Sequence, residues 1–122
     1  MRHVQIINTE NPLKAPLVAA YCDSFISRFL GLMFTRSIPS DSGLLIAENK
    51  ESILGASIHM MFMNYNIAAI WINSQMEVVD VQLAKRWHLS YVPKAPASFI
   101  LETHLDRIYD FIIGDILQFE SA

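Results

Sequence analysis

The sequence predicts a mainly β protein: a compact β-sandwich or small barrel-like domain of about eight short strands and two short helices. Three observations favour this class. The chain has 122 residues, which is the size of one domain, so we assign residues 1–122 to a single unit. Its apolar runs are short and close together. Turn-forming residues separate these runs, as is typical of strands joined by hairpins.

Three strands are expected in the first third of the chain. Residues 4–7 contain Val4, Ile6 and Ile7 and suit a first short strand, which residues 8–12 end. Residues 17–22 form a second apolar run. Residues 44–47 form a third, which opens after a loop containing Pro39 and Gly43.

The middle of the chain predicts a central strand and a hairpin. Residues 57–63 read as one strand, and residues 67–72 are apolar on both faces, which indicates a covered position inside a sheet. Residues 76–85 form the returning arm, in which Val79, Val81 and Leu83 share one face while Asp80 and Gln82 face the other. Strands at residues 98–101 and 115–119 complete the set.

Two helices interrupt the strands. One is expected near residues 24–30, where Gly31 can end it. The second is expected near residues 104–112, after a capping Thr103 and before Gly114. Its apolar stripe has helical spacing and consists of Leu105, Ile108, Tyr109 and Ile112.

Composition narrows the classes of function. A formal charge of -3 argues against nucleic-acid binding, which needs a basic surface. No apolar run is long enough to span a membrane, and no export signal is evident, so we expect no membrane association and a cytoplasmic location. The single cysteine, Cys22, fits a reducing compartment. An apolar fraction of 52% suggests an exposed apolar surface suited to a homodimer or a protein partner.

Five short motifs then occur in a recognisable order. They are G-L-M-F-T-R-S-I-P with G-L-L at residues 31–45, S-I-H-M-M-F-M at 57–63, E-V-V at 77–79, I-L-E at 100–102 and G-D at 114–115. Over residues 17–119 the chain resembles the bacterial and archaeal family called domain of unknown function 192. The resemblance implies a compact, mostly β domain. It implies no established activity, substrate or catalytic residue.

Arg28 and Arg36 flank an apolar segment and are the first candidate site residues. A guanidinium group can hold a carboxylate or a phosphate in a bidentate manner. The alternative is structural, because these side chains can pair with Glu102, Asp41 or Asp115, or cap backbone carbonyls. We favour the structural role.

His59, Met61 and Met63 would share one face of a strand. One imidazole and two thioethers are soft ligands of the kind that selects Cu(I), which makes these residues a weak candidate metal site. Methionine is also a common filler of cores, and we favour core packing with a half-buried histidine.

The loop at residues 87–93 is rich in aromatic residues, among them Trp87 and Tyr91. Such side chains anchor ligands and partners because they are large and amphipathic. The loop could instead fold down as a lid on the core. It is still the segment where we expect binding.

Catalytic motifs are sparse. The chain lacks a nucleophile elbow, a phosphate-binding glycine loop and a metalloprotease motif. We therefore expect a non-catalytic ligand- or protein-binding module without a cofactor. Its candidate ligand-binding residues are Arg28, Arg36, His59, Trp87, Tyr91 and Glu102. The alternative is a small enzyme or Cu(I) carrier that uses His59 with Met61 and Met63, or with Glu102.

Overall fold

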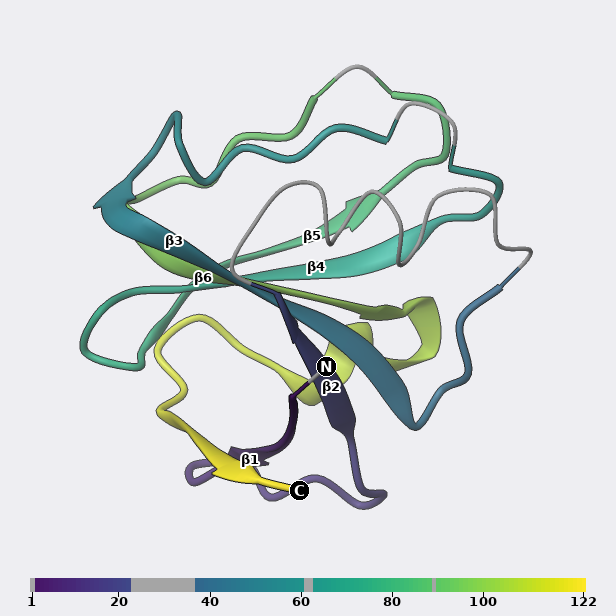
Figure 1. The fold of residues 1–122 in the computed structure, drawn as a ribbon, viewed down its shortest axis with the longest axis vertical. Helices are drawn as coiled ribbons and strands as arrows, with labels where there is room; N and C mark the ends of the chain where they lie inside the picture. Colours follow the sequence, from purple (N-terminus) through teal and green to yellow (C-terminus); the bar gives the residue numbers. More distant parts are fainter. Residues whose placement is uncertain (1, 23–36, 61–62, 89) are drawn as a thin grey trace.

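The computed structural model describes residues 2–22, 37–60, 63–88 and 90–122, and these build one curled sheet of seven strands (Figure 1). The strands are β1 (His3–Asn8), β2 (Val18–Cys22), β3 (Ser42–Ser52), β4 (Ile67–Ile72), β5 (Val78–Ala84), β6 (Ala97–His104) and β7 (Leu117–Ser121). The helix among the described residues is the 3-10 helix η1 (Leu105–Asp110). The mainly β class is thus confirmed. The helix expected near residues 24–30 lies outside the described residues.

The strands are ordered β5-β4-β6-β3-β2-β1-β7 across the sheet. Among these seven described strands, β2 and β3 pair in parallel, and the other neighbours are antiparallel. The two ends of this order meet at one place, because Val78 N–H donates to the Asp115 carbonyl at 2.8 Å and Leu117 N–H donates to the Met76 carbonyl at 2.9 Å. These bonds curl the sheet into a half-barrel.

Strand β4 lies between β5 and β6, and all six of its residues are buried. This confirms the central, covered strand expected from its uninterrupted apolar sequence. Because side chains alternate along a strand, β4 contributes to two separate hydrophobic clusters. The first contains Ile67, Ala69 and Trp71, and the second contains Ala68, Ile70 and Ile72.

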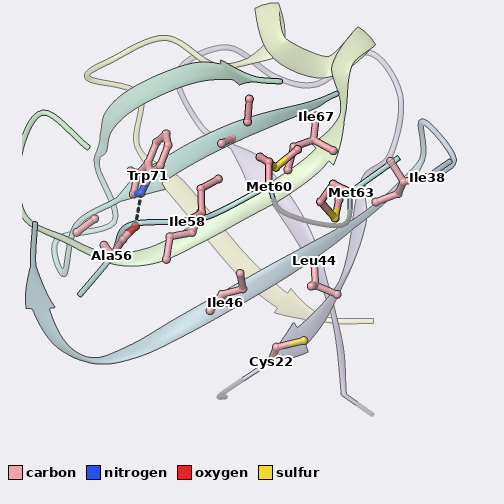
Figure 2. Packing of buried hydrophobic residues seen from close by; sticks show 14 residues of the cluster. Cys22, Ile38, Leu44, Ile46, Ala56, Ile58, Met60, Met63, Ile67 and Trp71 are labelled. Carbon is pink, nitrogen blue, oxygen red and sulfur yellow. Dashed lines mark hydrogen bonds between the residues drawn. The ribbon is translucent and has the colours of Figure 1, made fainter. Parts of the chain in front are cut away.

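The first cluster is built around Trp71, which is fully buried (Figure 2). Its indole N–H donates to the Ala56 carbonyl at 2.7 Å, so the one polar atom of the ring is satisfied inside the core. Ile58, Met60 and Met63 pack into the same cluster. Residues 56–60 therefore cover this face of the sheet, while η1 and Phe111 cover the other.

The segment expected to be a strand at residues 57–63 differs from the prediction. In its described part, it forms an isolated bridge between Ile58 and Tyr91 rather than a strand of the sheet. The physical reason is that its buried residues pack down onto the sheet face, and this takes the segment out of the plane of the ladder. Hydrophobic alternation alone cannot separate these two uses of an extended segment.

Helix η1 is also shorter than the expected helix, and its cap differs. The imidazole Nδ1 of His104 accepts a hydrogen bond from the Asp106 N–H at 3.0 Å and caps the helix. Thr103 belongs to β6, and its hydroxyl donates to the Ser42 carbonyl at 2.7 Å. Gly114 follows in a turn at φ 102°, a conformation that favours glycine.

On β5 the expected common face of Val79, Val81 and Leu83 is not found, because a register shift opposite Trp71 and Ile72 turns Val79 to the first cluster and Val81 to the second. Asp80 is fully buried, whereas Leu83 is 41% exposed. Strand β5 is at the end of the sheet order, and the Asp80 carboxylate accepts hydrogen bonds from the backbone N–H groups of Val81 (2.9 Å) and Lys94 (3.0 Å). Asp80 is therefore buried because it caps a strand edge. Among the described residues, no helix has the length and apolarity needed to cross a membrane.

Candidate functional site

The candidate site begins where β5 ends. Residues 85–88 form a turn, named here the Trp87 turn, and the chain then runs back beside residues 58–60. Ile58 and Tyr91 exchange two backbone hydrogen bonds of 3.0 and 2.7 Å. Met60 N–H donates to the His88 carbonyl, and Trp87 N–H donates to the Met60 carbonyl. Because Ile58 and Met60 are buried anchors, the turn is attached to the core.

Each backbone N–H of the Trp87 turn is hydrogen-bonded. Lys85 N–H donates to the Tyr91 hydroxyl at 2.8 Å, and Arg86 N–H donates to the Asn66 side-chain oxygen at 2.9 Å. Trp87 N–H reaches the Met60 carbonyl at 2.8 Å, and His88 N–H reaches the Lys85 carbonyl at 3.3 Å. The turn is therefore fixed from several sides.

Trp87 adopts φ 65°, a left-handed conformation that is unfavourable for a bulky side chain. Its side chain is nevertheless 55% exposed. A strained backbone persists only where its surroundings hold it, and such positions concentrate at functional sites. The structure thus uses several hydrogen bonds to hold a large aromatic residue partly in solvent.

Tyr91, the other aromatic candidate of this loop, has a different position. It is half-buried and packs against the first cluster. Its ring stacks on His88 with centroids 5.5 Å apart, and its hydroxyl accepts the hydrogen bond from Lys85. Tyr91 therefore connects the turn to the core, while the Trp87 side chain is exposed to solvent.

His59 is half-buried, between the core residues Ile58 and Met60. Neighbours on an extended segment face opposite sides, so His59 faces away from the cluster that holds Met60. Met63 lies fully buried in that cluster with Met60 (Figure 2). Met61 lies outside the described residues. In the part of the chain that the structure describes, no three His, Cys, Asp or Glu side chains are grouped so that they could hold a metal.

Glu102 is fully buried in β6, opposite Leu44 of β3 and Ala69 of β4. It shares its face of the sheet with Ile100 of the first cluster, because both occupy even positions of one strand. Glu102 therefore lies in the interior and not on the Trp87 turn. Arg28 and Arg36 lie outside the described residues.

A buried arginine that sequence analysis did not single out organises the opposite side of the molecule. Arg107 in η1 is 6% exposed and pairs with Asp110 at 2.5 Å. Its guanidinium also donates to the carbonyls of Ala15, Pro16 and Ser40. The spacing of Arg107 and Asp110, three residues apart on a short helix, was the one available signal.

Asp115 was expected as a partner of Arg28 or Arg36, and in the described residues its carboxylate contacts amide groups. Its carboxylate accepts hydrogen bonds from the side chains of Asn8 and Asn11, both at 2.8 Å, and from the Ile112 N–H at 2.9 Å. This network ties the loop after β1 to the turn after η1.

A second exposed apolar surface lies beside this network. Tyr109 is 92% exposed, and Ile112 and Ile113 are more than half exposed. They adjoin a groove of about 480 Å³ that is lined by Asn11, Pro12, Leu13, Lys14, Tyr109, Asp110 and Ile112. Because η1 and residues 56–60 cover opposite faces of the sheet, the Tyr109 surface is separate from the Trp87 turn and provides a matched control for it.

Two carboxylates of β3 have shifted pKa values. Burial raises the pKa of Glu48 above its usual value. The pKa of Glu51 is lowered, first because its carboxylate accepts a hydrogen bond from the backbone N–H of Ser74 at 2.6 Å. Glu51 thereby joins β3 to the β4–β5 hairpin.

The chain is similar to a family of proteins and to several of its members. Residues 6–119 match the family DUF192, which is described as "Uncharacterized ACR". A UPF0127 protein of Thermococcus gammatolerans is 38% identical over 100 residues, covering 80% of this chain and 63% of the relative. A UPF0127 protein of Pyrococcus furiosus is 37% identical over 97 residues, covering 80% of each chain. Both relatives are archaeal, and the chain spans less than two thirds of the Thermococcus protein.

Two crystal structures share the fold. A Sinorhizobium meliloti protein superposes with a TM-score of 0.80 at 17% identity and covers 97% of this chain and 92% of its own. A protein of unknown function from Novosphingobium aromaticivorans gives a TM-score of 0.77 at 16% identity, covering 95% of this chain and 83% of its own. At such low identities these likenesses concern the fold alone.

Proposed function

We propose a binding function for this chain, which belongs to the DUF192 family of uncharacterised conserved proteins. In this proposal the domain is a non-catalytic module that binds a protein partner through the Trp87 turn. The observation that carries it is the exposed Trp87 side chain, held at φ 65° by a turn whose backbone N–H groups are all hydrogen-bonded.

The physical argument concerns preorganisation. A free loop loses conformational entropy when a partner orders it, and this loss weakens binding. Here the turn is ordered before the partner arrives. Tryptophan is also the side chain most enriched among residues that dominate binding energy, because it combines a large apolar area with a hydrogen-bond donor.

An exposed apolar residue follows the turn in the same segment. Val92 is 41% exposed, whereas the equally exposed Leu83 pairs with Ala68 of the second cluster and lies on the other face of the sheet. The Val92 carbonyl accepts a hydrogen bond from the Gln82 side chain at 3.0 Å, which keeps residues 92–94 alongside β5. A partner that covers Trp87 and follows the chain to residue 92 would bury Val92 as well, and this burial adds to affinity through the hydrophobic effect.

Selection of displayed peptides tests the proposal. A random dodecapeptide library is selected on the wild-type domain, on Trp87→Ser and on Tyr109→Ser, which removes an exposed aromatic from the separate surface. We expect wild type and Tyr109→Ser to enrich one common consensus that Trp87→Ser does not enrich. Enrichment of the same consensus by Trp87→Ser would refute a binding role for the turn.

A further inference from the structure

The Trp87 turn and the segment that follows it in the chain carry three basic residues. Lys85, Arg86 and Lys94 are exposed, and they are three of the nine lysines and arginines in the chain. No Asp or Glu occurs from residue 81 to residue 101. Residues 52–76, which include the segment that pairs with the turn, have none either. The sequence around the turn therefore contains basic residues and no acidic ones.

This distribution is opposite to that of the whole protein. The formal charge of the chain is -3, so the other residues together carry -6 when these three cations are set aside. A local excess of exposed groups of one sign, on a domain of the other sign, favours partners of complementary charge and speeds their association.

The three cations are available to a partner. In the described ranges, ion pairs join His104 with Asp106 and Arg107 with Asp110, and neither pair involves the turn. The carboxylate nearest along the chain, Asp80, is fully buried and already accepts several hydrogen bonds, one of them from the Lys94 backbone.

We propose that the partner bound at the Trp87 turn is an acidic polypeptide segment, with carboxylates at Lys85, Arg86 and Lys94 and an apolar side chain on Trp87. This inference rests on the proposed function and names its partner class. A fixed backbone favours a polypeptide over an anionic lipid surface, because lipid headgroups attract cations without requiring that they be held in one geometry. Arginine and tryptophan are also the residues that dominate protein interfaces.

Titration calorimetry with two short peptides tests the partner class. The probes are acetyl-Glu-Glu-Phe-Glu-Glu-amide and its isostere in which every Glu is Gln. We expect the acidic peptide to bind roughly tenfold more tightly at low salt, since a few exposed ion pairs each contribute a fraction of a kcal/mol. The preference should shrink at 0.5 M salt, where charges are screened.

Matched variants assign the preference to the turn. Lys85→Ala/Arg86→Ala should bring the two peptides to within about twofold of each other, as expected when exposed ion pairs are removed. Lys14→Ala/Lys50→Ala, which removes two exposed lysines elsewhere, should leave the preference unchanged. Trp87→Ser should weaken both peptides.

The possible outcomes separate the two proposals. Equal, Trp87-dependent binding of both peptides overturns the acidic partner and leaves the binding turn intact. Charge-selective binding whose affinity Trp87→Ser does not weaken overturns the proposed function itself. If neither peptide binds but phosphatidylglycerol vesicles bind more tightly than phosphatidylcholine vesicles in a Lys85/Arg86-dependent manner, the partner is a lipid surface and the inference is wrong. Absence of binding to every probe is also contrary to it.

Discussion

Replacing Arg107 by methionine should destabilise the domain strongly. The methionine keeps much of the buried volume but removes the guanidinium group that joins Asp110 to the carbonyls of Ala15, Pro16 and Ser40. Each buried polar group left unsatisfied costs about 1 to 3 kcal/mol. Water can reach some of the freed carbonyls, so we expect a total loss of about 3 to 5 kcal/mol in the free energy of unfolding.

Urea denaturation followed by circular dichroism measures this loss. Because single domains have a free energy of unfolding of about 5 to 15 kcal/mol, the shift in midpoint should be large. Arg86→Met removes an exposed arginine from the Trp87 turn and should change stability by no more than about 0.5 kcal/mol. A loss below about 1 kcal/mol for Arg107→Met would show that the network does not hold the loops together.

Three further predictions concern single side chains. The folded-state pKa of Glu51 lies below its unfolded value, so the stabilisation from its contact with Ser74 is present above the unfolded pKa and is lost as pH falls through the folded pKa. The urea midpoints of wild type and Glu51→Gln should therefore differ at pH 7 and converge in acid. A difference that does not depend on pH would contradict this. Asp80→Ala should lower the free energy of unfolding by about 2 kcal/mol and increase light scattering when the protein is concentrated, because it leaves backbone N–H groups at a strand edge without their acceptor. A variant that is stable and monodisperse argues against this role of Asp80. Trp71→Phe removes the hydrogen bond to Ala56 and leaves a cavity, so the free energy of unfolding should fall by about 2 to 4 kcal/mol. Thermal denaturation measures this change, and an unchanged melting temperature would be inconsistent with the packing of Trp71.

The fold was largely predictable where local pattern and tertiary role agree. Residues 67–72 are apolar without interruption, and they form the fully buried strand β4. Prediction failed where one pattern serves two roles. Residues 57–63 alternate like a strand, yet their described part packs on the sheet because Ile58 and Met60 fill its hydrophobic face. Asp80 was placed with Gln82 on the face opposite Val79, and its sequence neighbours do not reveal that it is buried and caps a strand edge.

The candidate site was predictable in part. The aromatic content of residues 87–93 drew attention to this loop as the place to look for binding, but the sequence could not distinguish Trp87 from Tyr91. That difference arises from pairing with residues 58–60, which are distant in sequence, and from the positive φ of Trp87. Arg107 was missed because a single arginine in a short amphipathic stretch is typical of a solvent-exposed helix face.

The central claim is that the Trp87 turn is a binding surface. Its most direct test is a calorimetric comparison of one selected peptide on wild type, Trp87→Ser and Tyr109→Ser. We predict that Trp87→Ser binds at least roughly tenfold more weakly, because truncation of a central tryptophan typically costs about 2 kcal/mol or more, and that Tyr109→Ser binds as wild type does. Equal affinity of wild type and Trp87→Ser, with both folded to the same melting temperature, would contradict the account.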